Sequence, residues 1–579
     1  MPITRSTYIW PAFHSRPTVS SKKGVVASGH YAATAAGIRM LAQGGNAIDA
    51  GVATAFALAV VRAHKDGIGG ECPILIYSPK TGQVYAISGV GFAPASLSIK
   101  YLQSQHIEAI PGFGYLGALV PAQVGAFCTA LKLFGTLPLE KVLEPAIELC
   151  NGFPMYEGLR EFLSTTEDGL FTKILPENGK IFLKDGKAPA CGTPVIQKDL
   201  GRTYERLAEA AQSGKDREEG IDRAVERFYR GDIAREIIAY VRSFPVEDPT
   251  GVHTSLLTLE DFAQYQTIVE KPLSVPYGEY TVYKCGPWSQ GPVLLQNLRL
   301  LSGFPLKDMG HNSAEYIHTL IECSKIAYND RNRYYGDTRF VHVPFDRLLS
   351  EQYAEKRRKE ISRMKANNSV MWEENLFDAR LERDKTDTTH LDAIDADGFM
   401  MSATPSGGWI RSSPRVPGVG LQLTTRGQMF YMDGISPNSL EPGKRPRTTL
   451  TPTIALKNGK PFMAFGSPGG DNQDQWGIQA FLNVVEFDMY LQDAVDAATV
   501  YTCHFKDSFY PHEAMPGYVF YEPLAPAVVN ELIRRGHKMV ALEPYSSGEV
   551  CVVRMNEKTG FIEGAASPKE ERQAYAMGW

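Results

Sequence analysis

Hydrophobic positions recur with helical spacing through much of the first 330 residues. Two helices of small residues are predicted first, His30–Leu41 and a second one that follows the Gly44-Gly45 break and begins at Asn46. Asp49, three positions after Asn46, completes the pattern of a capping box. Between about Leu119 and Asn332 the chain is expected to be mainly helical, with amphipathic stretches at 122–134, 140–150, 203–212, 222–243 and 313–334.

Strand pairs are predicted mainly in the last third, where short apolar runs flank tight-turn dipeptides. The expected hairpins join Thr389–Ile394 to Met400–Thr404, Thr453–Leu456 to Phe462–Phe465, and Val552–Met555 to Phe561–Gly564. An earlier hairpin joins Pro73–Tyr77 to Val84–Ser88. Helical stretches at 474–487 and 524–536 lie between the later pairs. Strand pairs interleaved with helices predict stacked sheets covered by helices, an α+β enzyme-like body.

Composition narrows the class of protein. With 579 residues, 43% hydrophobic and 22% charged, the chain can bury a large core. A net charge of −5 argues against a nucleic-acid partner, and the longest apolar stretch, Ala50 to Val61, is too short to span a membrane. Eight dispersed cysteines without a CxxC motif indicate reduced, mostly buried thiols and no zinc site. Because the first twenty residues lack a long apolar run, we expect a cytoplasmic protein.

The first candidate for chemistry is Asp387-Thr388-Thr389-His390, which enters a predicted strand. A threonine hydroxyl is a weak nucleophile unless a base lies beside it, and a threonine at a chain N-terminus can use its own α-amine. On its own, Thr-Thr at a strand start is explained by β-propensity.

A second candidate is the loop Phe465-Gly466-Ser467-Pro468-Gly469-Gly470-Asp471, between a predicted strand and a predicted helix. Two glycines let successive backbone N–H groups point into one space, where they could stabilise an oxyanion. An ordinary glycine-rich turn with Asp471 as the helix N-cap is the alternative.

These segments, with others in order along the chain, resemble the γ-glutamyltransferase family of N-terminal nucleophile (Ntn) hydrolases. The resemblance runs from about Gly24 to the C-terminus. It is carried by Gly44-Gly45-Asn46-Ala47-Ile48-Asp49-Ala50, Gly67-Ile68-Gly69-Gly70, Val120-Pro121, Leu257-Thr258-Leu259-Glu260-Asp261-Phe262, Ile321-Glu322 through Arg331, Asp387-Thr388-Thr389-His390, Pro442-Gly443-Lys444-Arg445-Pro446 and Ser467-Pro468-Gly469-Gly470.

The resemblance implies a four-layer αββα sandwich made as an inactive precursor. It implies self-cleavage between Asp387 and Thr388, which gives a large chain (1–387) and a small chain (388–579) that stay associated as one composite catalytic domain. The freed amine of Thr388 then acts as base for its own hydroxyl, and Gly469 and Gly470 hold the oxyanion. This chemistry requires no metal and no cofactor. The oligomeric state stays open, a homo-oligomer included.

Some positions depart from the family pattern but keep the acyl-transfer residues plausible. The family's paired serines after the Pro-Gly-Lys-Arg-Pro motif are Thr448 and Thr449 here. The threonine that supports the nucleophile falls on Ser406, and an asparagine two residues later falls on Gly408, which loses a polar contact.

The substrate-recognition positions differ more. The family's arginine for the glutamyl α-carboxylate falls on Val90, and its aspartate for the α-amine falls on Met429. Because unpaired ions are costly to bury, a γ-glutamyl substrate is disfavoured. Arg426, Arg411 and Arg415 lie in the segment that borders the substrate in this family, and an arginine there could bind a carboxylate instead. Arg426 is the first candidate, and the alternative is that these arginines bridge loops or face solvent.

Four other residues invite a catalytic interpretation but favour a structural one. His390 follows the nucleophile and is expected to be a packed histidine. Glu322 and Asp330-Arg331 are expected to form ion pairs on a helix surface.

The stretches Thr425-Arg426-Gly427 and Pro287-Trp288-Ser289-Gln290-Gly291 are similar to the oxamate amidohydrolase and cephalosporin-acylase-like members of the family rather than to its glutathione transferases. The sequence therefore predicts an autoprocessing amidohydrolase or acyltransferase that cleaves a C–N amide bond of a small, carboxylated, non-γ-glutamyl substrate through an acyl-Thr388 intermediate. Two alternatives remain. One is a γ-glutamyl hydrolase or transpeptidase acting on glutathione or related compounds, and the other is an uncleaved, non-catalytic binding protein.

Overall fold

A computed structural model describes residues 15–166, 169–369 and 388–579 and contains two antiparallel seven-stranded sheets. Sheet I has the order β21-β2-β12-β13-β3-β4-β9 and sheet II the order β1-β20-β19-β15-β14-β11-β10. The strands of sheet I are β2 (Gly24–Ser28), β3 (Ile74–Ser78), β4 (Gln83–Ile87), β9 (Val269–Glu270), β12 (Leu391–Asp395), β13 (Met400–Ala403) and β21 (Tyr575–Gly578). Those of sheet II are β1 (Val19–Ser21), β10 (Leu273–Tyr277), β11 (Tyr280–Lys284), β14 (Thr453–Lys457), β15 (Lys460–Gly466), β19 (Cys551–Met555) and β20 (Ile562–Ala566).

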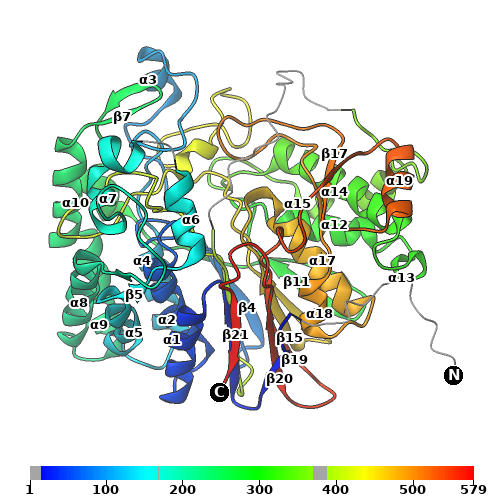
Figure 1. Ribbon diagram of the computed structural model, residues 1–579, viewed down its shortest axis with the longest axis horizontal. Coiled ribbons are helices and arrows are strands. Elements are labelled where there is room, and N and C mark those ends of the chain that lie inside the picture. The colour runs from blue at the N-terminus through cyan, green and yellow to red at the C-terminus, as the bar shows by residue number, and fades with distance from the viewer. Residues whose placement is uncertain (1–14, 167–168, 370–387) are drawn as a thin grey trace.

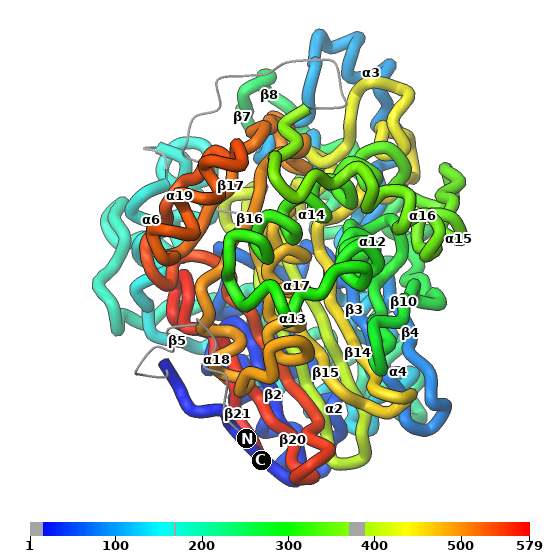
Figure 2. Tube along the Cα trace, turned by 90° about the vertical axis from the view of Figure 1, so that its right-hand side faces the viewer, coloured from blue at the N-terminus to red at the C-terminus, as the bar shows by residue number. Residues whose placement is uncertain are grey.

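Helices cover the outer face of each sheet, so that the layers run helix, sheet, sheet, helix (Figure 1). The layer on sheet I contains α1 (Tyr31–Ala42), α2 (Ala47–Val61), α4 (Gln123–Phe134), α5 (Leu139–Cys150), α6 (Glu157–Thr165), α7 (Pro176–Phe182), α8 (Lys198–Gln212), α9 (Arg217–Tyr229) and α10 (Asp232–Ser243). The layer on sheet II contains α12 (Pro292–Leu301), α14 (Ala314–Tyr334), α16 (Glu351–Arg358), α17 (Gln473–Val485), α18 (Leu491–Asp496) and α19 (Pro526–Arg534). Figure 2 looks onto this second layer, with α12 and α17 in front of β14 and β15.

Shorter elements complete the described part of the chain. They are α3 (Ile99–Ser104), α11 (Leu259–Gln264), α13 (Leu306–Met309), α15 (Phe345–Leu348), η1 (Leu170–Ile174), η2 (Arg426–Met429), η3 (Gly470–Asn472), β5 (Phe153–Pro154), β6 (Pro194–Val195), β7 (Val246–Asp248), β8 (Gly251–His253), β16 (Val500–Thr502), β17 (Tyr518–Tyr521) and β18 (Lys538–Ala541). None of the helices in the described ranges is both long and apolar enough to cross a bilayer.

The local signals of the sequence explain the two central helices. The His30 ring accepts the Ala32 N–H at the start of α1, and Asn46 and Asp49 form the expected capping box at the start of α2. All fifteen residues of α2 are buried, so its small side chains let sheet I and the neighbouring helices pack close on every side.

Apolar side chains also fill the space between the sheets. This inter-sheet core joins sheet I residues such as Val25 and Leu75 to sheet II residues such as Ile454 and Val553. The fold class predicted from the sequence, a four-layer αββα sandwich, is therefore confirmed, as are all four predicted hairpins.

The structure adds two details to the predicted helical region. The stretch 222–243 is not one helix, because the chain breaks at Gly231 between α9 and α10. The region also contains β10 and β11, which were not predicted. Pro276 lies within β10, and this is tolerated because β10 is the edge strand of sheet II.

All eight cysteines are free, and all but Cys191 are buried, as expected.

Candidate active site

Thr388 lies just before β12 and is completely buried. Its Oγ1 is 3.1 Å from the Oγ of Ser406, which follows β13. The antiparallel pairing of β12 with β13, extended by a hydrogen bond from Thr389 N to the Pro405 carbonyl at 3.1 Å, brings the two hydroxyls together. Asp387, the other residue of the expected cleavage site, lies outside the described residues.

Arg426 is the next residue in this cluster, and it is also completely buried. Its Nη2 donates to Ser406 Oγ at 2.7 Å, and its Nε pairs with the carboxylate of Glu71. The guanidinium carbon lies 5.1 Å from the ring centre of Trp409 and 5.6 Å from that of Phe509. The arginine expected from the sequence to bind substrate is therefore tied to the nucleophile's neighbour.

The loop Gly67–Gly70 explains how Glu71 reaches this cluster. Glu71 and Ser406 exchange backbone hydrogen bonds of 2.8 and 2.9 Å, so the loop lies directly against the segment after β13. Gly408 makes this approach possible, because its φ is +60° and an added Cβ would lie 2.9 Å from Gly67 O. Any side chain at position 408 would therefore crowd the loop and the segment after β13.

Two buried carboxyl groups flank the loop. Burial raises the pKa of Glu71, and the neighbouring Arg426 opposes the rise. Burial raises the pKa of Asp66 to about 7, although Gln123 donates a hydrogen bond to it. Gln123 Nε2 also lies 3.1 Å from the Ser406 carbonyl, so Asp66 is linked to the same segment.

The candidate oxyanion loop approaches from sheet II. Gly466, the last residue of β15, packs against the ring of His390, two residues after the nucleophile. Gly469 and Gly470 follow with φ values of +115° and +56°, and η3 begins at Gly470. An added Cβ on Gly469 would collide with the Trp476 ring, so glycine is required there both for conformation and for space. Sheet stacking thus places the two predicted halves of the site on facing strands.

A network of buried polar side chains supports this loop. Gln290 Nε2 donates to the Gly470 carbonyl at 3.2 Å, and Arg331 Nη1 donates to Gln290 Oε1 at 3.0 Å. Arg331 also pairs with Asp471, which accepts hydrogen bonds from the backbone N–H and the hydroxyl of Ser508 at 2.8 and 2.7 Å. Burial alone would raise the pKa of Asp471, but Arg331 and Ser508 together lower it. The carboxylate is thus held in its charged form behind the loop.

Asp471 and Arg331 correct two sequence-based interpretations. Asp471 is not a helix N-cap, since α17 is preceded by Asn472 without a side-chain cap. Arg331 is not on a helix surface, and neither are Glu322 and Asp330, because all three are buried. Glu322 pairs with Lys325 and Asp330 with Arg357.

The threonine pair after the Pro-Gly-Lys-Arg-Pro motif joins the loop through Gln290. Thr448 N donates to the Trp288 carbonyl at 2.9 Å, and Gln290 N donates to the Thr448 carbonyl at 2.8 Å. Thr448 and Thr449 are both buried, and the Thr449 hydroxyl has no hydrogen-bond partner within the described ranges. The structure thus brings Thr448 to the side of Gly470.

The remaining residues discussed from the sequence are His390, Val90, Met429 and Arg411. His390 is buried, with its ring nitrogens 2.9 Å from Thr404 Oγ1 and 3.0 Å from Asp392 Oδ2, as expected for a packed histidine. Val90 and Met429 are buried, and Val90 belongs to the inter-sheet core. Arg411 lies with its guanidinium carbon 5.8 Å from the Trp409 ring centre.

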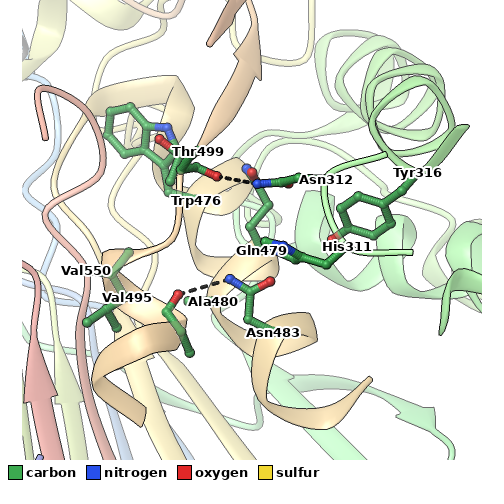
Figure 3. A pocket seen from close by; sticks show the side chains of 12 residues that line it. His311, Asn312, Tyr316, Trp476, Gln479, Ala480, Asn483, Val495, Thr499 and Val550 are labelled. Atoms are coloured by element: carbon green, nitrogen blue, oxygen red, sulfur yellow. Dashed lines mark hydrogen bonds between the residues drawn. The ribbon is translucent and has the colours of Figure 1, made fainter. Parts of the chain in front are cut away.

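Trp476 borders a separate, small cavity between α17 and α14 (Figure 3). Its volume of about 10 Å³ is enough for about one water molecule. Asn312 and Asn483 point toward it and donate to backbone carbonyls of Ala498 and Ala494 at 3.0 Å each. This cavity is too small for a substrate, but Trp476, which borders it, is the residue whose ring leaves no space for a side chain at Gly469.

One group of potential metal ligands exists among the described residues, formed by His318, Glu322 and His537 with ligand atoms within 4.8 Å of one another. Lys325 Nζ lies 2.7 Å from Glu322 Oε1, and the two histidines are hydrogen-bonded to each other at 2.8 Å. The ammonium group competes for the carboxylate, so the residues fit an internal polar cluster better than a divalent cation.

A buried threonine at a strand start, a hydroxyl partner and a facing glycine loop on stacked sheets define an Ntn-hydrolase site. The chain belongs to the γ-glutamyltranspeptidase family, whose model matches residues 33–577. It is accordingly an amide-cleaving Ntn hydrolase, as the sequence motifs predicted.

Three comparisons illustrate the similarity. The chain is 29% identical to the glutathione hydrolase-like YwrD proenzyme of Bacillus subtilis (strain 168), over 97% of this chain and 99% of that protein. It is 39% identical to the solved structure of LmbA2991T421A, with a TM-score of 0.91 over 98% of this chain and 100% of the other. The cephalosporin acylase from Bacillus halodurans is 28% identical, with a TM-score of 0.84 over 100% of this chain and 99% of that one.

Proposed function

We propose that this protein cleaves its own Asp387–Thr388 bond and then hydrolyses a C–N amide bond of a small, carboxylated, non-γ-glutamyl substrate. The observation that carries the proposal is the 3.1 Å contact between Thr388 Oγ1 and Ser406 Oγ, beside a buried arginine. A threonine supported in this way, with a facing loop that requires glycine, matches the needs of acyl transfer.

Maturation and turnover use the same oxygen atom. In maturation, Thr388 Oγ1 adds to the Asp387 carbonyl carbon, the C–N bond breaks and the nitrogen takes a proton. Water then hydrolyses the ester, leaving a carboxylate on Asp387 and a free α-amine on Thr388. In turnover, that amine takes the hydroxyl proton as Thr388 Oγ1 adds to the substrate carbonyl carbon, and the Gly469 and Gly470 N–H groups stabilise the oxyanion. The proton passes to the leaving amine as the C–N bond breaks. Water then hydrolyses the acyl-Thr388 ester, which releases the acid and restores the hydroxyl and the free amine.

The charges near the nucleophile favour one class of substrate. Val90 and Met429 offer no ionic partner where the family binds a zwitterionic head group, and both are buried. Arg426 Nη1 is buried without a hydrogen-bond partner in the described residues, so it supports recognition of an anionic or carbonyl oxygen beside the nucleophile. Arg411, on the same Trp409 ring, is the second candidate. A carboxylate without an adjacent ammonium group fits these residues best.

A γ-glutamyl substrate is the competing proposal, favoured by the similarity to the YwrD proenzyme, whose name describes it as glutathione hydrolase-like. Three p-nitroanilides separate the proposals: γ-glutamyl, glutaryl, which lacks only the α-amine, and butyryl, which also lacks the carboxylate. Oxamate hydrolysis is measured beside them.

We expect kcat/KM for the glutaryl compound to exceed that for the γ-glutamyl compound by about 100-fold or more. The γ-glutamyl ammonium group would be buried without an ionic partner, at a cost of several kcal/mol, and about 1.4 kcal/mol corresponds to each factor of ten. Butyryl should also be poor, and the acylated small chain should appear by mass spectrometry at Thr388. Preference for the γ-glutamyl compound would favour the competing proposal. Absence of an acyl adduct with any substrate would support a binding protein.

A further inference from the structure

The strongest unassigned feature of the site is the chain of contacts that runs from Glu71 through Arg426 and Ser406 to Thr388. Arg426 Nε pairs with Glu71, Arg426 Nη2 donates to Ser406 Oγ at 2.7 Å, and Ser406 Oγ lies 3.1 Å from Thr388 Oγ1. All four residues are completely buried. Each contact in this chain therefore operates in a low-dielectric interior, where charged hydrogen bonds are strong.

Glu71 and Ser406 are fixed in place independently of the guanidinium. Their backbones are joined by reciprocal hydrogen bonds of 2.8 and 2.9 Å, and Thr424 Oγ1 donates to Glu71 Oε1 at 3.1 Å. The rings of Trp409 and Phe509 lie near the guanidinium, with centroid distances of 5.1 and 5.6 Å. The guanidinium thus has a defined orientation before any substrate binds.

A hydrogen bond from a cation to a hydroxyl oxygen makes the O–H of that hydroxyl a stronger donor, because it withdraws electron density from the oxygen. Arg426 does this to Ser406, whose neighbour is the oxygen that becomes negative when Thr388 loses its proton. Glu71 holds the guanidinium in place and balances its charge, which avoids an uncompensated buried cation.

We propose that Glu71 and Arg426 form a positioning pair that polarises Ser406 and, through it, activates Thr388 in self-cleavage as well as in substrate turnover. The inference rests on the proposed function and assigns its activation step to two residues that do not have to contact the substrate. It differs from a role of Arg426 in binding the substrate carboxylate alone, because self-cleavage contains no external substrate.

The test compares self-cleavage rates in pulse-labelled cell-free synthesis, followed by denaturing gel. The main variant is E71Q/R426Q, which removes both charges and leaves no buried ion unpaired. R426K keeps the charge but lacks the planar fork that reaches both Glu71 and Ser406. R206Q is the matched control, because Arg206 makes a two-pronged ion pair with Glu236 at 2.9 and 3.0 Å on α8 and α10.

We expect E71Q/R426Q to slow self-cleavage by about 10- to 100-fold, R426K to recover part of that rate, and R206Q to match wild type. In matured enzyme, kcat should fall, in addition to any rise in KM that follows from removing Arg426 as a partner for the substrate carboxylate. In an S406A background, adding E71Q/R426Q should change the rate by less than about threefold, since the relay is already broken.

Normal self-cleavage by E71Q/R426Q, with only KM raised, would overturn the positioning role while leaving the proposed function intact. A full additional loss in the S406A background would also overturn it, because the pair would then act without Ser406. If E71Q/R426Q does not fold, as judged by circular dichroism, R426K alone decides: a wild-type cleavage rate in that variant contradicts the proposal. Failure of wild type to self-cleave would instead refute the proposed function.

Discussion

Substitution of Gly408 tests quantitatively how closely the Gly67–Gly70 loop packs against the segment after β13. An alanine Cβ at this position would lie 2.9 Å from Gly67 O and Gly70 N and 3.1 Å from Gln422 O, all of them backbone atoms. Gly459, in the β14–β15 turn, is the control, because its φ of +78° is similar and no atom lies within 4 Å of an added Cβ.

Both substitutions lose unfolding free energy through backbone conformation, and only Gly408→Ala also loses it through overpacking. A non-glycine residue at positive φ costs about 1–2 kcal/mol, which applies to Gly408→Ala and Gly459→Ala alike. Overpacking against the backbone adds about 1–3 kcal/mol for Gly408→Ala alone. The expected losses of unfolding free energy are therefore about 2–5 kcal/mol for Gly408→Ala and about 1–2 kcal/mol for Gly459→Ala.

Urea unfolding followed by circular dichroism measures this difference, and self-cleavage measured in parallel reports on the site. We expect Gly408→Ala to unfold at the lower urea concentration and to mature more slowly, because Ser406 lies two residues away. Equal midpoints and equal maturation for the two variants would refute the argument that Gly408 is required for the close approach.

Gly469→Ala, which forces a side chain toward Trp476 and distorts the oxyanion loop, should lower kcat by about 100-fold or more in an anilide assay, and an unchanged kcat would exclude that loop from catalysis. Asp66→Asn should gain stability relative to wild type as pH rises from about 4 to 7, with a slope of up to about 1.4 kcal/mol per pH unit. The reason is that the folded-state pKa of Asp66 is raised to about 7, so that the folded wild type holds a proton that the unfolded chain loses. A pH-independent difference in urea unfolding between the two proteins would contradict this. The two chains formed at Thr388 should co-elute on native size exclusion and separate only in denaturant, because β12 and β13 lie between β2 and β3 in sheet I, and free fragments on the native column would contradict this.

Local features of the fold could be predicted from the sequence because the signals are local. The capping box at Asn46 and Asp49 and the turn at Asn458-Gly459 each act over a few residues. The β10 strand was missed because Pro276 argues against a strand unless the strand lies at a sheet edge, and edge position is a property of the assembled sheet.

The candidate site likewise contains residues that could be predicted from the sequence and residues that could not. Thr388, Gly469 and Ser406 are found from short motifs and the family resemblance, and the structure places Ser406 beside Thr388. Glu71 was missed because it meets Arg426 from 355 positions away in the sequence. Arg331 was taken for a helix-surface residue, since its partner Asp471 is brought to it only by the packing of α14 against the loop after β15. Long-range pairs of this kind leave no periodic signal.

Every step proposed for this protein requires that Thr388 is a nucleophile released by self-cleavage. Intact-mass analysis and N-terminal sequencing of wild type and Thr388→Ala test it most directly. We expect two wild-type chains, 1–387 and 388–579, with the second beginning at Thr388, and a single chain of about 63.9 kDa for Thr388→Ala. A single wild-type chain, or cleavage at another bond that persists in Thr388→Ala, would contradict it.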